Sequence, residues 1–390
     1  MYQIVIDTTK PRLTHRERFR RLMHFQTVDR GVHWEFGYLT ETVERWQKEG
    51  LPEGFRRYEG RGSIEEYFGV DPYTWVPCDH GLQPPFSGEV KVLKEEEGKR
   101  IEQHPDGTIM EVKTKGIKTI PHYIKMPIAG WDDWKRFKER LHPDSPERKR
   151  FDYRRLNEEF RHASIPVGIS MGSFFGIPRN WIGFEQISLM LYDDRGLVED
   201  IIETLTCLYE ANLRRALREV EVDFAGGWED ICFRSGPMIN PAMFRELVAP
   251  RVKRVCTLLR QHGVDIIWTD CDGNINDLVP IWLECGLNCM FPVEVHAGSD
   301  PVELRLRYGH NILLRGGINK RALSQGKREI LKELKRVEGL VADGGYIPGV
   351  DHRVHQDVSY DNYRYYIREK LVMLGWLKEE IEAVEGLAGM

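Results

Sequence analysis

Short apolar runs alternate with longer stretches of helical periodicity through the last 240 residues of the chain. Repeated strand and helix units imply parallel strands joined by right-handed crossovers. The apolar runs predict six strands, at residues 165–170, 222–227, 265–269, 288–294, 312–317 and 345–350. Amphipathic helices are predicted between them, at residues 197–220, 241–262 and 327–341.

The number of these units favours a closed barrel over an open sheet. The residues before 150 leave room for two more strands, which would complete a (β/α)8 TIM barrel. No linker rich in Pro, Gly or Ser divides the chain, so we expect one domain over residues 1–390. Because a minimal barrel needs about 250 residues, the excess predicts additional N-terminal helices and an insertion.

The insertion is predicted at residues 89–115, where apolar and polar positions alternate with period two. The pairs Glu97-Gly98 and Asp106-Gly107 interrupt this alternation and are typical of hairpin turns. The pattern predicts a solvent-facing antiparallel meander at one edge of the barrel. We assign no chemistry to it.

Composition excludes several kinds of partner. The chain has 56 Lys and Arg against 61 Asp and Glu, so it lacks the cationic field that nucleic acid or an anionic membrane surface requires. No apolar run approaches the roughly 20 residues of a membrane span, and the first residues do not resemble a signal peptide, so we expect a cytoplasmic protein. Seven cysteines without a CxxC pair predict reduced thiols. Glycine-rich phosphate loops are absent, so no nucleotide cofactor is expected.

Polar residues follow the predicted strands where parallel barrels build their active sites, at the carboxyl ends. These residues are mainly acidic: Glu229, Asp270, Asp272 and Glu294, with His352 after the last strand. Carboxylates a few ångströms apart repel each other unless a cation or a shared proton relieves them. The sequence therefore predicts a site at the barrel mouth that holds a divalent cation or a protonated carboxyl group.

Each of these residues also has a structural explanation. Asp272 fits a tight turn that leads to a helix N-cap, and a histidine such as His352 is often only hydrogen-bonded. Of Glu229 and Asp230, only one can point inward if the strand continues, and we expect Glu229. Cys271, between two aspartates, is expected to be buried and unreactive.

The loop after the strand at 165–170 contains two adjacent aromatic residues, Phe174 and Phe175. They fit either a flat platform for a ligand or ordinary barrel packing, and the sequence does not decide between the two. Both residues are therefore candidate substrate contacts.

Six motifs follow one another in a fixed order over most of the chain. They are Arg16-Glu17-Arg18-Phe19 with Val28-Asp29-Arg30; Gly236-Pro237 through Pro241, Phe244 and Pro250; Asp272-Gly273-Asn274; Pro292 with Glu294; Gly316-Gly317-Ile318-Asn319-Lys320; and Gly344-Gly345-Tyr346-Ile347 with Asp351-His352. This order resembles the uroporphyrinogen decarboxylase (URO-D) superfamily, which contains tetrapyrrole decarboxylases and corrinoid methyltransferases. The resemblance implies a single eight-stranded barrel and a homodimer.

The decarboxylases of that superfamily clamp substrate carboxylates with arginines of an N-terminal RQAGRYLPEY segment. The similar stretch here, residues 33–41, has no arginine and carries Glu35 instead. Tyr38 in this stretch is a candidate substrate contact, as is Glu294. If the substrate does carry carboxylates, Arg179 or Arg234 are the alternatives for holding them.

The methyltransferases of the superfamily bind zinc through an HxC pair and a later cysteine. The positions that look like these ligands are Asp270, Asp272 and His352. A zinc site with cysteine thiolate ligands is therefore not expected. Two carboxylates and an imidazole can still bind zinc or another hard or borderline divalent metal.

The resemblance implies an enzyme of one-carbon chemistry, and we expect His352, Asp272 and Glu229 to be its catalytic residues, Glu229 from its place after a predicted strand. We expect a small-molecule substrate, and we prefer methyl transfer to a corrinoid on a partner protein, because both clamping arginines are missing. The first alternative is a uroporphyrinogen decarboxylase-like carboxy-lyase. The second is a catalytically silent binding subunit.

Overall fold

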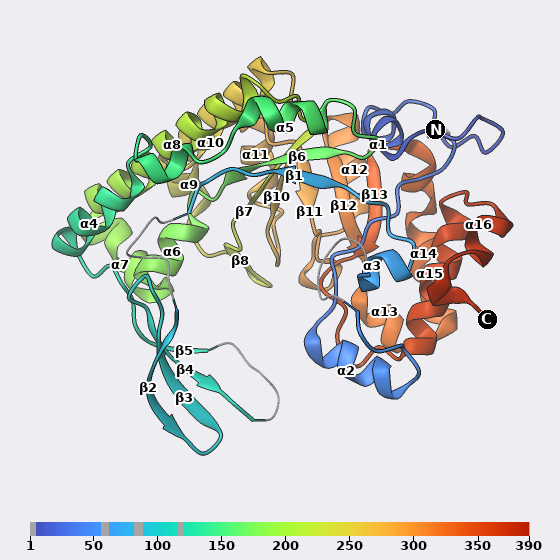
Figure 1. Ribbon diagram of the computed structural model, residues 1–390, viewed down its shortest axis with the longest axis horizontal. Coiled ribbons are helices and arrows are strands. Elements are labelled where there is room, and N and C mark those ends of the chain that lie inside the picture. The colour runs from blue at the N-terminus through green and yellow to red at the C-terminus, as the bar shows by residue number, and fades with distance from the viewer. Residues whose placement is uncertain (1–4, 56–61, 82–88, 116–120, 390) are drawn as a thin grey trace.

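A parallel sheet wrapped by helices forms the main body of the protein (Figure 1). The computed structural model describes residues 5–55, 62–81, 89–115 and 121–389. The helices are α1 (His15–Met23), α2 (Thr40–Lys48), α3 (Ile64–Tyr67), α4 (Trp131–Lys138), α5 (Tyr153–Phe160), α6 (Gly176–Ile182), α7 (Phe184–Asp193), α8 (Arg195–Leu217), α9 (Pro241–Leu247), α10 (Ala249–Gln261), α11 (Val279–Cys285), α12 (Pro301–Tyr308), α13 (Lys320–Ser324), α14 (Lys327–Asp343), α15 (Tyr360–Met373) and α16 (Lys378–Glu382).

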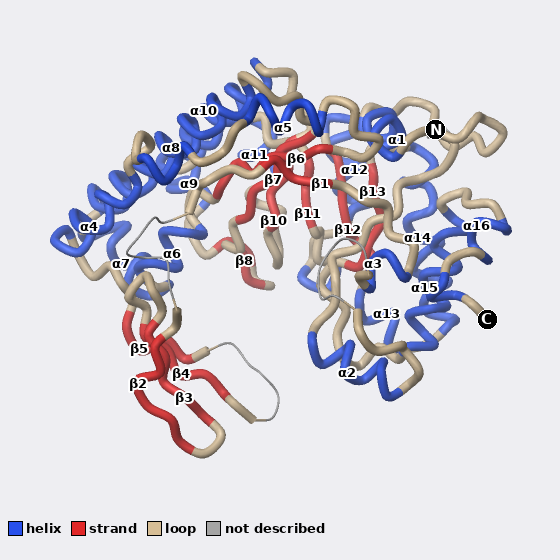
Figure 2. Tube along the Cα trace, in the orientation of Figure 1, coloured by secondary structure: helices blue, strands red, loops and turns tan. Residues whose placement is uncertain are grey.

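The sheet has seven parallel strands in the order β1-β6-β7-β10-β11-β12-β13. The strands are β1 (Thr74–Val76), β6 (Val167–Gly172), β7 (Phe224–Trp228), β10 (Ile267–Asp270), β11 (Cys289–Phe291), β12 (Leu313–Ile318) and β13 (Tyr346–Val350). All six strands that the apolar runs predict are present, because strands covered by helices are apolar along their whole length. The sheet is strongly curled (Figure 2).

The closed eight-stranded barrel that we expected is not confirmed. Between the two edge strands, the described part of the chain places residues 33–38, which form no strand of their own. The N–H of Val350 at the end of β13 donates to the side chain of Glu35 at 3.1 Å. Because that carboxylate takes the place of a main-chain carbonyl, the regular ladder stops there. On the other side, the N–H of Asp71 donates to the carbonyl of His33 at 2.8 Å.

The predicted helix at 241–262 is two helices, α9 and α10, which meet at Val248. Pro250 causes the break, because proline has no N–H to donate and tolerates only the first turn of a helix. The other long helices match their pattern. In α14, the buried residues Ile330, Leu334, Val337 and Val341 recur at the spacing of one helical face.

Aromatic side chains fill the space inside the curled sheet at the amino-terminal ends of its strands. Phe224 stacks on Trp268 with ring centroids 4.3 Å apart, and Phe19 of α1 closes this end against Phe224. Two glycines make the room: a Cβ on Gly168 would lie 2.1 Å from the Phe224 ring, and one on Gly226 would lie 2.6 Å from Trp268 Nε1. The carboxyl-terminal half is left unfilled by this core.

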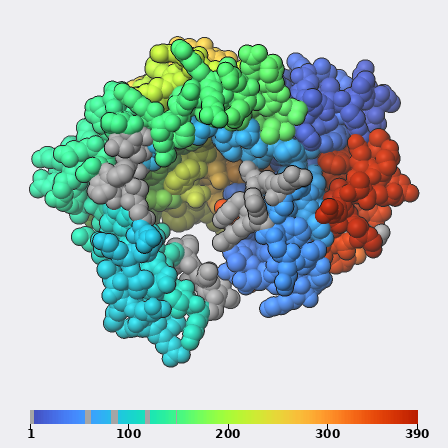
Figure 3. Space-filling model, in the orientation of Figure 1, coloured from blue at the N-terminus to red at the C-terminus, as the bar shows by residue number. Residues whose placement is uncertain are grey.

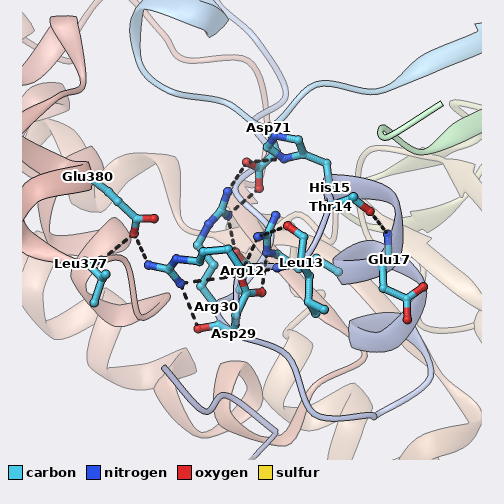
Figure 4. Close-up of polar contacts among 12 residues, drawn as sticks. Arg12, Leu13, Thr14, His15, Glu17, Asp29, Arg30, Asp71, Leu377 and Glu380 are labelled. Atoms are coloured by element: carbon cyan, nitrogen blue, oxygen red, sulfur yellow. Dashed lines mark hydrogen bonds and ion pairs between the residues drawn. The ribbon is translucent and has the colours of Figure 1, made fainter. Parts of the chain in front are cut away.

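A charge network ties the N-terminal segment to the C-terminal helices (Figure 4). Arg12 bridges Asp29 and Glu380, and Arg30 donates to both carboxylate oxygens of Asp71 at 2.8 and 2.7 Å. Burial opposes the ionisation of Asp71, but the Arg30 guanidinium outweighs it and holds the pKa of Asp71 well below its usual range.

The meander is a separate four-stranded antiparallel sheet, made of β2 (Lys91–Glu96), β3 (Lys99–Gln103), β4 (Ile109–Lys113) and β5 (His122–Lys125). It projects from the body of the molecule (Figure 2). Gly98 and Gly107, in the two turns that the sequence indicates, have φ of 81° and 95°, values that favour glycine. Among the described helices, none combines the length and the apolar character needed to cross a membrane.

Candidate active site

A cavity of about 770 Å³ is lined by the carboxyl ends of β7, β10 and β11 and, on one side, by residues 70–73 that lead into β1. Figure 3 shows a hollow in the middle of the face of the molecule that is turned to the viewer. Six aromatic residues line the cavity: Phe36, Tyr73, Trp75, Trp228, Trp268 and Phe291. Six charged residues also line it: Glu35, Glu65, Glu66, Asp71, Asp270 and Arg315. A concave site with an apolar wall and a few charged groups is typical of small-molecule binding.

Three aspartates meet at the mouth of the barrel. Carboxylate oxygens of Asp230, Asp270 and Asp272 lie within 4.8 Å of one another. Asp270 ends β10 and lines the cavity. Asp270 and Asp272 each have one buried carboxylate oxygen that finds no hydrogen-bond partner among the described residues. Buried polar atoms normally have partners, so these two oxygens are available to a ligand.

The cluster resists ionisation. Burial, and then the neighbouring Asp230 and Glu294, raise the pKa of Asp272 to about 7. Burial and the other two aspartates of the cluster raise the pKa of Asp270 well above its usual value. A cation or a bound proton would relieve this repulsion.

Glu294, His352 and Lys320 border the aspartates. Lys320 Nζ lies 2.5 Å from one oxygen of Glu294, and the N–H of Gly273 donates to the other at 2.9 Å. Burial opposes this charge, but Lys320 outweighs it and lowers the pKa of Glu294. His352 Nε2 lies 3.5 Å from Asp272 Oδ2, and burial followed by the Lys320 charge lowers the pKa of His352. The structure therefore brings Asp270, Asp272, Glu294 and His352 together, as the strand-end rule predicts.

Glu229 is not at the mouth. Its buried carboxylate accepts hydrogen bonds from the N–H groups of Phe174, Phe175 and Gly176 at 2.7–2.8 Å. We expected Glu229 rather than Asp230 to point inward, and the structure has the reverse. Asp230 has φ of 48°, which breaks the strand alternation and turns its side chain to the cluster. Glu229 instead holds the loop that leads into α6.

The other candidate substrate contacts lie away from the cavity. Phe174 and Phe175 are each 2% exposed and belong to the core, so they form no platform. The Tyr38 hydroxyl lies 2.9 Å from that of Tyr363, between helices. The guanidinium of Arg179 donates to the main-chain carbonyl of Asp230, so it supports the mouth from outside the cavity.

The sequence reasoning overlooked two charged residues of the cavity region. Lys370 is fully buried and lies 2.6 Å from Glu35, whose carboxylate also accepts from the Tyr366 hydroxyl at 2.9 Å. The charge of Glu35 is therefore neutralised within the protein. Arg315 is 7% exposed and stands in the middle of β12, in the sequence LLRGGI. A charged residue inside a buried apolar strand is rare unless it is paired. This position of Arg315 is the feature of the sequence that could have marked it as a candidate site residue.

Comparison with known proteins places the chain in a family. A family model described as uroporphyrinogen decarboxylase (URO-D) matches residues 108–369, more than half of the chain. The chain belongs to the URO-D family. No curated protein sequence matches this URO-D protein.

The fold agrees with this membership. A solved structure of a methyltransferase from Methanosarcina mazei superposes on 93% of this chain and 100% of its own, with a TM-score of 0.56 and 13% sequence identity. At that identity the likeness shows a common fold.

The donor atoms at the mouth of this URO-D protein fit a divalent metal held by oxygen. Asp230, Asp270 and Asp272 supply carboxylates, and two of them have a buried oxygen without a partner among the residues described. The nearby thiol, Cys271, is fully buried and lies against the N–H of Ile231 at 3.4 Å. Burial raises its pKa well above the usual value, so it does not fit as a thiolate ligand.

Proposed function

We propose that this protein is an enzyme of one-carbon chemistry that takes a methyl group from a small molecule in the barrel cavity and passes it to a corrinoid on a partner protein. The observation that carries the proposal is the position of the aspartate cluster. Asp270 is at once part of that cluster and part of the wall of an aromatic-lined cavity. A substrate in the cavity therefore presents its reacting group to carboxylates that can hold a cation or a proton.

The roles of the residues follow from methyl-transfer chemistry. The bond between the methyl carbon and its heteroatom breaks, and the electron pair stays on the heteroatom. Asp230, Asp270 and Asp272 would hold a divalent metal there, and such a metal supplies Lewis-acid polarisation of the heteroatom. His352 is positioned 3.5 Å from Asp272 to accept or deliver a proton, and its lowered pKa keeps the imidazole neutral at physiological pH.

The charge of the cavity wall argues against uroporphyrinogen as the substrate. Among the described residues that line the cavity, five carry carboxyl groups, and Arg315 supplies the single positive charge. Two of the carboxylates, Glu35 and Asp71, are paired with Lys370 and Arg30, which leaves Glu65, Glu66 and Asp270 to face a ligand. Uroporphyrinogen has eight carboxylates, and burying them without cationic partners is costly. A smaller molecule with few negative charges suits this wall better.

The test is a methyl-transfer assay with purified protein, free cob(I)alamin and a panel of methylated amines, alcohols and aryl ethers. We expect methylcobalamin to form with at least one donor, and Asp272→Asn to abolish it. Asp277→Asn is the matched control, since Asp277 is exposed on the same loop. Elemental analysis of the wild type and of Asp272→Asn should show a divalent metal in the first and less of it in the second.

Two results would overturn the proposal. Efficient loss of carbon dioxide from uroporphyrinogen would make the carboxy-lyase alternative correct. No turnover of any compound in either assay, by protein without bound metal, would favour the silent binding subunit.

A further inference from the structure

Arg315 is a buried cation that no carboxylate of the described residues contacts directly, although its charge acts at longer range on Asp270. It is 7% exposed, and the described part of the chain offers its guanidinium neither a hydrogen bond nor an ion pair. Other buried arginines of the molecule differ in this respect, since Arg18 contacts Asp29 and Arg30 contacts Asp71. A buried charge that no counter-ion contacts directly is unfavourable, so its retention calls for a reason outside the free protein.

Four aromatic rings surround this guanidinium. Its central carbon lies 4.2 Å from the ring centroid of Phe291, 5.0 Å from that of Trp34, 5.1 Å from that of Trp268 and 5.9 Å from that of Tyr73. Cation–π contacts of this kind hold the group in place. They use the ring faces and leave the N–H donors free.

Those donors are open to the cavity. Arg315 lines the cavity, and none of its nitrogen atoms is among the fully buried atoms that lack a partner. The neighbouring carboxylate of Glu35 is occupied by Lys370. A guanidinium with unused donors matches a planar carboxylate, which it binds through two parallel hydrogen bonds.

The rest of the cavity suits a flat apolar body. Trp75 and Trp228 join Tyr73, Trp268 and Phe291 in its wall. Trp75 is 37% exposed although it contacts the aromatic core, which leaves its ring available for stacking. The volume of about 770 Å³ lies in the usual range for a small organic ligand.

Arg315 and Asp270 stand on β12 and β10, with β11 between them. Neighbouring strands are about 4.8 Å apart, so one aromatic ring can reach from the guanidinium to the aspartate cluster. We infer that Arg315 binds the carboxylate of an aromatic substrate whose reacting group lies at the opposite end of the ring, next to Asp270. The position of the reacting group rests on the proposed function, whereas the carboxylate site does not.

The experiment measures binding by tryptophan fluorescence and calorimetry, with 4-methoxybenzoate and the neutral 4-methoxybenzamide as probes. We expect the wild type to bind the benzoate more tightly than the amide. In Arg315→Met the benzoate should bind about ten- to a hundredfold more weakly, as for the loss of hydrogen bonds to a charged group, and the preference over the amide should vanish. Arg321→Met is the control, because Arg321 is exposed on α13 near the same mouth.

Further arms distinguish the alternatives. Arg315→Lys keeps the positive charge but loses the planar guanidinium that donates two parallel hydrogen bonds, so intermediate affinity for the benzoate is expected. Circular dichroism checks that both variants fold. Equal benzoate affinity in the wild type and Arg315→Met would overturn the inference, as would no benzoate binding by the wild type. Tighter binding of phenyl phosphate than of benzoate would overturn the carboxylate assignment and show that Arg315 binds a phosphate group. Binding with this pattern but without methyl transfer would leave the carboxylate site standing and contradict only the proposed function.

Discussion

Buried charges at the amino-terminal end of the barrel are paired. The Nε of Arg16 on α1 donates to both oxygens of Asp223 at 3.1 and 2.9 Å, and the N–H of Val167 donates to the same carboxylate at 2.7 Å. Arg18 donates to both oxygens of Asp29 at 2.9 and 2.7 Å. These pairs join α1 to the start of β7 and to the loop that contains Asp29.

At the carboxyl-terminal ends of the strands, Lys320 pairs with Glu294 and Lys370 with Glu35, but other buried charges lack such partners. Asp270 and Asp272 have oxygens without hydrogen bonds, and Arg315 faces the cavity with rings around it, as far as the described residues show. The two ends differ because a paired charge stabilises the fold, whereas an unpaired charge costs stability and is useful only when a ligand arrives. The pairing of buried charges thus separates the structural end from the functional end.

The largest expected effect is at the structural end. Asp223→Asn removes the buried carboxylate that Arg16 and Arg20 share and leaves Arg16 only the exposed Glu221 at 3.6 Å, so we expect the free energy of unfolding to fall by about 3–5 kcal/mol. Urea denaturation measures it. Glu221→Gln is the control: this side chain is 65% exposed and also contacts Arg20, so its loss should change stability by less than about 1 kcal/mol. Equal effects of the two variants would show that burial of the pair does not matter.

Substitution of two glycines in the strands tests whether the core and the cavity wall differ in rigidity. In Gly168→Ala the new methyl group meets the fully buried ring of Phe224, so overpacking should cost about 1–3 kcal/mol. In Gly226→Ala the methyl meets Trp268 and the partly exposed Trp75, which can shift into the cavity. We expect a smaller loss of stability and weaker binding of 4-methoxybenzoate. A larger loss for Gly226→Ala would mean that the cavity wall is as rigid as the core.

The smallest expected effect concerns pH. Because the pKa of Asp272 is about 7, a proton competes with any cation at the cluster below that pH. Mn²⁺ affinity, followed by electron paramagnetic resonance, should rise by up to about tenfold per pH unit below 7 and level off above it. In Asp272→Asn binding should be weaker and its pH dependence flatter. The same steep rise in the variant would assign the titrating group elsewhere.

Much of the fold follows from the sequence. The apolar runs predict the strands because both faces of a parallel sheet are covered, and the strand-end rule predicts that Asp270, Asp272, Glu294 and His352 meet. The helix break at Pro250 was also readable, since proline interrupts a helix after its first turn.

The remaining features depend on contacts that periodicity does not encode. The exchange of Glu229 and Asp230 follows from a positive φ at Asp230, and the missing eighth strand follows from the Glu35 carboxylate bonding to Val350. Arg315 had a signal, a charge inside an apolar run. Whether that charge is paired becomes visible only when Phe291 and the other rings are placed around it.

Charges at the mouth are kept for a ligand at the expense of stability. The folded-state pKa of Asp272, about 7 against an ordinary 3.8, means that the native protein holds this proton more tightly than the unfolded chain. The contribution of Asp272 to stability therefore falls as pH rises from about 4 to about 7. At higher pH, the ionised carboxylate should destabilise the folded state.

The most direct measurement compares the free energies of unfolding of Asp272→Asn and Asp29→Asn at about pH 8, without divalent cations. We expect the two changes in stability to have opposite signs. Asp272→Asn should raise the stability because it removes a buried charge and its repulsion by Asp230 and Glu294. Asp29→Asn should lower it by about 3–5 kcal/mol because Arg18 loses its partner. A loss of stability of similar size in both variants would contradict the account.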